Sequence, residues 1–322
     1  MRKTTFLVTA LIIVLLLLMA LGICLGSVKI SLKDILSALF NPKATNNVVY
    51  IIRNLRLPRV LCAILAGAAL SLGGLVFQSV FRNPMADSYL LGVSSGASCL
   101  IGFNILLGFG LSNVPAAFLG SVGATSLLFA TNKGNQQKLL LSGIALNFLL
   151  SALTSLTIYL GKHQMDSVIY WTMGSLSASS WPRVYALAAA VLFSLLLLIK
   201  SANAMDLLLM DDSTAISSGL NLRKTRLLLL FCASLLTALV VSFCGIIGFV
   251  GLMSPHFARL LMGPKHKRLI PVSTLLGSIL LLLADILCRF LIAPSELPIG
   301  IITSILGAPV FLVLLRRNRN AF

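Results

Sequence analysis

Apolar runs of about 20 residues recur along nearly the whole chain, with short polar connections between them. Each run matches the roughly 30 Å hydrocarbon thickness of a bilayer, where a helix pairs its own backbone groups. Charged residues make up only 10% of the 322 residues, against about 25% in a soluble domain. The sequence therefore predicts an all-α polytopic membrane protein, with one transmembrane domain over 1–322. The ten predicted spans lie near 5–26, 58–81, 90–109, 113–131, 138–160, 183–200, 226–244, 247–262, 270–292 and 300–315.

The positions of the basic residues predict how the chain is oriented. A formal net charge of +17 would suggest nucleic acid in a soluble protein. Here Lys and Arg lie mostly in short connections, so membrane topology is the better interpretation and no nucleic-acid partner is expected. With the N-terminus inside, sixteen of the 25 basic residues are cytoplasmic, so we expect both termini in the cytoplasm. The first apolar stretch is long for a signal peptide, and we expect it to be retained as a span.

One stretch, "RNLRLPRV", departs from the general charge bias. It ends an outer connection over residues 27–57, in which "SLKDILSALF" reads as a short interfacial helix. Because positive charge on the outer side runs against the positive-inside rule, we expect this stretch to contact a partner. Six of the nine outer basic residues lie within 27–59: Lys29, Lys33, Lys43, Arg53, Arg56 and Arg59.

The largest inner connection covers residues 201–225 and carries apolar residues in a water-facing loop. Asp211, Asp212 and Ser213 precede a short helical stretch, and Gly219 follows it as a helix-ending residue would. Two short helices with exposed apolar residues suggest a docking surface for a cytoplasmic protein. The alternative is that these helices pack against their own bundle. A further short helix is expected on the outer side within 161–182, which carries two tryptophans.

Asp285 is the one acidic residue that falls inside a predicted span. Arg289 lies four positions later, on the same helical face. Charges inside a membrane are usually paired or face a cavity. The two residues are therefore either a structural pair or a functional group near the outer mouth. The six cysteines form no C-x-x-C pair and the three histidines are scattered, so we expect no metal site in the chain.

Several motifs, taken together and in order, resemble one known family. They are "RLPR", "GAALSLGGLVFQSVFRNPMADSYLLGVSSGA", "GFVGLMSPHFARLLMGPKHKRLIP", "ADILCRF" and "SELPIG". The chain resembles the FecCD family, the permeases of ABC importers for ferric siderophores, haem and vitamin B12. The resemblance implies a ten-helix bundle of the type II ABC importer kind. It also implies a dimer with itself or a sister permease, two cytoplasmic ATPase subunits below, and a substrate-binding protein outside.

The resemblance also implies roles for particular residues. Arginines at the outer mouth would meet glutamates of the binding protein, and the matching positions are Arg56, Arg59 and Arg289. The cytoplasmic gate would involve Asn83, Met85, Gln136 and Gln137. Helices over 205–221 would dock the ATPase, through Met205, Leu207, Leu208, Leu209, Met210, Asp211, Asp212, Ala215, Gly219 and Leu220.

The chain has no G-x-x-x-x-G-K-[ST] phosphate loop, so we expect a transporter subunit and not an enzyme. ATP and Mg²⁺ would belong to the partner ATPases, and this chain itself would bind no cofactor. The expected cargo is a ferric siderophore, with haem or cobalamin as alternatives, and the expected location is the cytoplasmic (inner) membrane. A different class, an ion-coupled secondary transporter, would need several intramembrane acids for a relay. An intramembrane enzyme lacks a suitable set of catalytic residues.

Overall fold

The computed structural model describes residues 2–25, 47–132, 136–161, 165–292 and 295–317. Every predicted span corresponds to a helix, and the described residues contain no strand. These ten helices are α1 (Arg2–Cys24), α4 (Leu57–Phe81), α5 (Val93–Leu107), α6 (Asn113–Asn132), α7 (Gln136–Gly161), α9 (Trp181–Lys200), α12 (Leu222–Cys244), α13 (Val250–Met262), α14 (His266–Phe290) and α15 (Ile299–Arg317).

Short elements connect these helices. They are α3 (Asn47–Tyr50), the π-helix η1 (Ile51–Arg56), the 3₁₀-helix η2 (Ser88–Leu91), α8 (Asp166–Thr172), α10 (Ala202–Leu208) and α11 (Asp212–Ser217). The expected short helix within 161–182 is α8, and the two expected in the inner connection are α10 and α11. The interfacial helix expected at "SLKDILSALF" lies outside the described residues.

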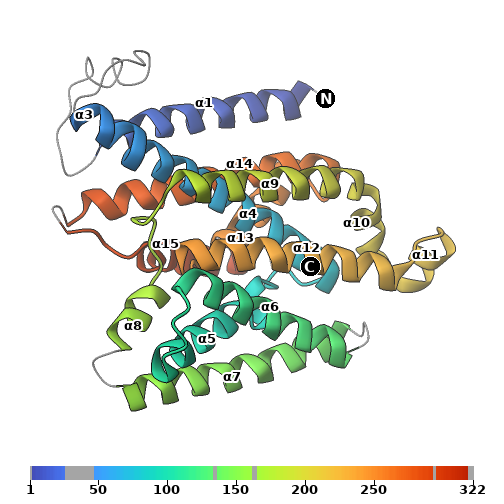
Figure 1. Ribbon diagram of the computed structural model, residues 1–322. Helices are drawn as coiled ribbons and strands as arrows, with labels where there is room; N and C mark the ends of the chain where they lie inside the picture. Colours follow the sequence, from blue (N-terminus) through green and yellow to red (C-terminus); the bar gives the residue numbers. More distant parts are fainter. Residues whose placement is uncertain (1, 26–46, 133–135, 162–164, 293–294, 318–322) are drawn as a thin grey trace.

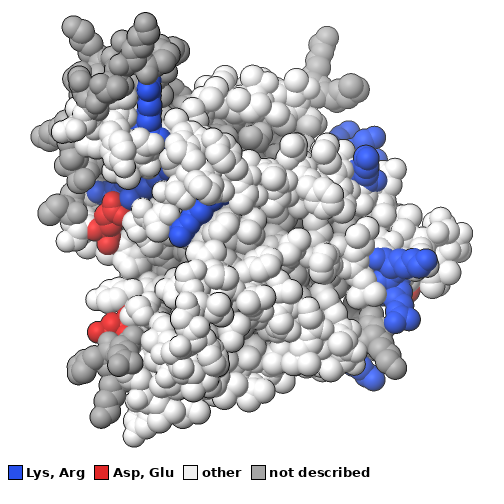
Figure 2. All heavy atoms as spheres, viewed as in Figure 1, with Lys and Arg blue, Asp and Glu red and all other residues white. Residues whose placement is uncertain are grey.

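Seven helices are long and apolar enough to cross a membrane, judged by length and composition over the described residues. Among the others, α13 has only 13 residues, or about 20 Å at 1.5 Å per residue. Figure 2 shows charged side chains at the two ends of one face of the bundle, with a broad uncharged band between. One end carries α10 and α11 and is called the α11 end; the opposite end carries α8 and is called the α8 end (Figure 1).

The second span begins at Asn47, ahead of its predicted start at residue 58. The helix is continuous to Phe81 because α3 and η1 lead directly into α4. The π-helix turn has a local cause, since Pro58 has no backbone N–H and its ring crowds the carbonyl four residues earlier. The backbone N–H of Leu57 accordingly bonds to the Ile52 carbonyl, five residues back.

α4 lies at the centre of the bundle, with α9, α12, α13 and α14 around it (Figure 1). Small residues let these backbones approach closely. A methyl group at Gly67 would collide with the Gly277 carbonyl of α14, and one at Gly74 would collide with Gly251 of α13. The helices α5, α6 and α7 form a second group, in which Gly96 and Gly120 make the same kind of contact. Close helix crossings therefore fix where the functional side chains at each end lie.

Candidate functional site

At the α8 end, a cluster of charged side chains joins α4 to α14. The Arg59 Nε donates to Asp285 Oδ1 at 2.8 Å. Its Nη1 donates to both carboxylate oxygens of Glu296, at 2.8 and 2.9 Å. Arg289 Nη2 forms an ion pair with Asp285 Oδ2 at 2.8 Å. The buried Asp285 carboxylate is therefore shared by two arginines, one from each helix.

Two arginines of this cluster also hold the end of α1. Arg56 Nη1 donates to the carbonyls of Ile23 and Cys24, at 2.7 and 2.9 Å. Arg289 Nη1 donates to those of Gly22 and Leu25, at 2.9 and 3.0 Å. The last carbonyls of a helix have no partner within the helix and carry partial negative charge. Arg56 and Arg289 therefore cap α1.

The three arginines predicted to bind an outer partner are thus placed differently from one another. Arg56 is only 6% exposed and Arg289 only 9%, and both are engaged with α1. Arg59 lies at the edge of the cluster, beside the 41% exposed side chain of Glu296. Only Arg59 of the three can exchange a carboxylate partner without releasing α1. The sequence carried no signal for the α1 contacts, because they join residues more than 30 positions apart.

At the α11 end, the residues predicted to dock an ATPase divide into two groups. Met205, Leu208 and Ala215 are fully buried, so they pack α10 and α11 onto the bundle. Leu209 and Met210 are exposed, as are Asp211, Asp212 and Gly219, while Leu207 and Leu220 are partly buried. Figure 1 shows α11 standing out beyond the helices next to it. One face of this segment therefore packs on its own bundle, as one alternative expected, and the other face is exposed.

Ile216 is an exposed apolar residue of α11 that the sequence reasoning missed. Its side chain is 61% exposed, more than those of Leu209 and Met210. The signal was present in the sequence, since Ile216 is the one large apolar residue in an otherwise small and polar α11. Together Leu209, Met210 and Ile216 give this end an apolar face, called here the α11 face.

A shared carboxylate ties α11 to the end of α4. Asp212 Oδ1 accepts from Arg82 Nη2 at 2.5 Å and from Arg226 Nη2 at 2.7 Å. Arg82 Nε also donates to the Leu208 carbonyl of α10 at 2.7 Å. The hydrogen bonds from Arg226 and then Arg82 hold the pKa of the Asp212 carboxyl below its ordinary value. Because the folded pKa is lowered, the link is intact at neutral pH and is lost only as acid protonates Asp212.

A second link at this end is buried. His266 Nδ1 lies 2.6 Å from Asp206 Oδ1, which also accepts from the His266 backbone N–H at 2.9 Å. Since an ionised carboxylate only accepts, Nδ1 is the donor, and Nε2 faces Ser79 Oγ at 2.6 Å. The three residue types are those of a hydrolytic triad. Ser79 and His266 are nevertheless fully buried, so no substrate reaches them, and the group braces α10 against α4 and α14.

Two of the residues predicted to form a gate, Asn83 and Met85, lie in the turn after Arg82. Asn83 follows Arg82 directly, and its Oδ1 accepts from the Met85 backbone N–H at 2.9 Å, which closes the turn after α4. Arg82 itself has a left-handed backbone, with φ of 48°. Met85 is exposed. Gln136 and Gln137 begin α7 at the same end, and the side chain of Gln136 lies outside the described residues.

Asp87 is a buried acid that sequence reasoning did not single out. Its Oδ1 accepts from the Ser88 backbone N–H at 2.6 Å and from Ser88 Oγ at 3.2 Å. A methyl group at Gly251 would lie 2.9 Å from this oxygen, so the carboxylate lies against the first turn of α13, where a negative charge is favoured. Burial raises the pKa of the Asp87 carboxyl, and the bonds from Ser88 oppose that shift.

The fold and these two ends define a class of protein. The bundle is a multi-pass membrane permease whose polar links connect an exposed segment at one end to its central helix. Residues 12–317 match the FecCD transport family, so the chain belongs to this family, as the motifs predicted. It is an ABC importer permease of the metal-chelate, haem and cobalamin type, and ATP hydrolysis in such transporters belongs to separate subunits.

Relatives and a solved structure agree with that assignment. The chain is 37% identical over 321 residues to the hemin transport system permease protein HmuU of Yersinia pestis, covering 96% of this chain and 95% of the relative. It is 36% identical over 307 residues to the Fe(3+) dicitrate transport system permease protein FecC of Escherichia coli K12, covering 92% of each. A metal-chelate type ABC transporter, solved in an inward-facing conformation, superposes with a TM-score of 0.87 at 31% identity, covering 96% of this chain and 98% of that one. This match confirms the type II importer fold.

Proposed function

We propose that this chain is the permease of an importer for ferric siderophores. It would work as a dimer, with itself or with a sister permease, in the cytoplasmic (inner) membrane, with both termini inside. The observation that carries the proposal is the similarity over 92% of each chain to a permease named for Fe(3+) dicitrate, itself an iron chelate. The hemin relative is similar over a comparable length, so haem is the main alternative cargo.

The α11 face supports an ATPase contact on the cytoplasmic side. Leu209, Met210 and Ile216 expose apolar surface at the end of a membrane bundle, where water would otherwise cover it. Asp212, next to this face, is bonded to Arg82 at the end of α4. A push on α11 therefore reaches α4 and the turn of Asn83 and Met85 through one carboxylate.

The charge cluster supports a contact with a binding protein on the outer side. Arg59 already holds a carboxylate, Glu296, in a partly exposed position. A glutamate of the partner would replace Glu296 on Arg59, because its carboxylate could accept from the same Nη1. Arg56 and Arg289 would act indirectly by holding α1, α4 and α14 together behind Arg59. Exposed pairs of this kind are worth about 0–1 kcal/mol, so the contact would mainly orient and speed docking.

Uptake by cells that lack this chain tests the cargo. Such cells, with and without a plasmid that restores the chain, would receive a radioactive iron-siderophore, haem or cobalamin in separate assays. The proposal expects restored uptake of the iron-siderophore alone. Restoration of haem or cobalamin uptake instead would assign the alternative cargo. Uptake that survives removal of ATP would refute the importer mechanism and favour an ion-coupled transporter.

A further inference from the structure

A groove of about 300 Å³ lies between α9 and α12, with Phe118 of α6 at its side. Phe193 and Leu197 of α9 face Phe231 and Leu235 of α12 across it. This volume is within the range of small-molecule sites. The groove runs along two membrane-crossing helices, so its occupant comes from the bilayer or from another membrane protein.

The lining of the groove suits hydrocarbon. Ser194 supplies the only oxygen among the lining side chains, and it accepts a bond from the Cys232 thiol at 3.2 Å. The lining therefore offers a polar ligand little beyond this one buried hydroxyl. An acyl chain fits such a lining, since it needs only van der Waals contact.

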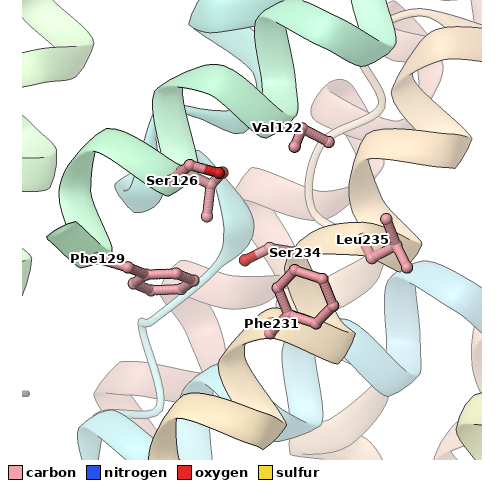
Figure 3. A pocket seen from close by; sticks show the side chains of 7 residues that line it. Val122, Ser126, Phe129, Phe231, Ser234 and Leu235 are labelled. Atoms are coloured by element: carbon pink, nitrogen blue, oxygen red, sulfur yellow. The ribbon is translucent and has the colours of Figure 1, made fainter.

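A second hollow lies on the other side of Phe231 and Leu235, against α6 (Figure 3). It holds only about 20 Å³, close to the space of one water molecule. Figure 3 shows the hydroxyl groups of Ser126 and Ser234 at this hollow. Because it is so small, it does not suit a second acyl chain. The larger groove is therefore a site for one chain.

Basic residues stand at one end of the groove. On α9, Lys200 follows the lining residue Leu197 by three positions, and on α12, Lys224 precedes Leu228 by four. Residues three or four apart lie on the same helical face, so each lining stripe ends in a lysine. Both lysines are exposed, and neither has an ion pair within the described part of the chain. They lie at the α11 end, where the helices leave the membrane.

We propose that this groove binds an anionic phospholipid, with one acyl chain between α9 and α12 and the phosphate between Lys200 and Lys224. Lysines beside a membrane surface attract anionic headgroups. The segment between α9 and α12 contains α10 and α11, so the bound lipid would brace the two helices that carry the α11 face. The inference needs only that the bundle crosses a membrane, and it is independent of the cargo and of any ATPase.

Spin-labelled lipids test this site. The purified full chain would be placed in vesicles of phosphatidylcholine, and the motionally restricted fraction of labelled phosphatidylglycerol would be compared with that of labelled phosphatidylcholine. We expect a preference for the anionic lipid of about five-fold for each lysine. The double variant Lys200→Gln/Lys224→Gln should lose that preference. Lys267→Gln, an exposed lysine of α14 away from the groove, should keep it.

A second variant tests the acyl-chain position. Ala190→Trp would fill the groove, whereas Leu196→Trp places the same side chain on α9 outside its lining. The first should reduce the restricted phosphatidylglycerol, and the second should not. Equal restriction of both lipids by the wild-type chain would overturn the proposal. So would efficient disulfide formation between two copies of Phe193→Cys, because a second copy of the chain would then cover the groove.

Discussion

The crossing of α4 and α14 at Gly67 and Gly277 makes a specific prediction about stability. A Cβ added at Gly67 would come closer than 3.0 Å to the carbonyl oxygen of Gly277 and would touch Leu281 Cβ at 3.0 Å. A backbone carbonyl inside a helix cannot rotate away, so Gly67→Ala must push α4 and α14 apart. The charge cluster of Arg59 and Asp285 joins the same two helices and would be stretched as well.

The expected change in the free energy of unfolding of Gly67→Ala follows from two opposing effects. Overpacking in a core costs about 1–3 kcal/mol, and the upper value applies because neither backbone can move alone. Replacing glycine by alanine within a helix regains about 1 kcal/mol of propensity. The net loss of unfolding free energy is therefore about 2 kcal/mol. At about 2–4 °C for each kcal/mol, the apparent Tm of Gly67→Ala should fall by about 4–8 °C.

Gly123→Ala is the matched control. Gly123 lies within α6, and an added Cβ would meet nothing within 4 Å. The variants would be heated in detergent with a dye that fluoresces on reaction with thiols, since five of the six cysteines are buried and react only on unfolding. Gly123→Ala should melt at or above the wild-type temperature. If Gly67→Ala melts as late as Gly123→Ala, the close crossing of α4 and α14 is wrong.

Three further predictions concern the two ends of the bundle. In vesicles containing the partner subunits, Asp212→Asn should uncouple ATP hydrolysis from uptake, because it weakens the bonds to Arg82 and Arg226. Asp211→Asn is the control, since the exposed Asp211 side chain makes no such bonds, and it should behave as wild type. Equal coupling in the two variants would refute a role for the Asp212 carboxylate in transmitting the push. Glu296→Gln should strengthen binding of the outer partner at low salt, because it frees Arg59 Nη1 from its carboxylate. Asp166→Asn is the control. An unchanged affinity would exclude the replacement of Glu296 by a carboxylate of the partner. Ile216→Asp should abolish co-purification of the ATPase while leaving the Tm unchanged, and retained co-purification would place docking elsewhere.

Local sequence was sufficient for the elements of this fold. Apolar runs located the ten long helices of the described residues, because hydropathy and length are properties of a single segment. The short helices α8, α10 and α11 were also predicted, from tryptophan placement and from the caps around Asp212 and Gly219. The family motifs were likewise readable directly, and the match over residues 12–317 confirmed them.

Helix boundaries were less predictable near Pro58. The second span was predicted to start near residue 58, yet the chain is already helical from Asn47, and a π-helix turn lies just before Pro58. Whether a helix begins at a proline or widens around it depends on packing of the preceding turn. Ile52 of that turn is fully buried, and no local sequence pattern predicted this burial.

The composition and order of residues alone determined that this chain is a helical membrane permease of one family, because those properties reside in short, contiguous stretches. Tertiary structure alone decided what each charged residue does. Arg56 and Arg289 became caps of α1, and Asp212 became a junction of three segments, because their partners lie 14 to 267 positions away. Such pairings arise only when helices pack, and the glycine crossings that bring those helices together set the geometry.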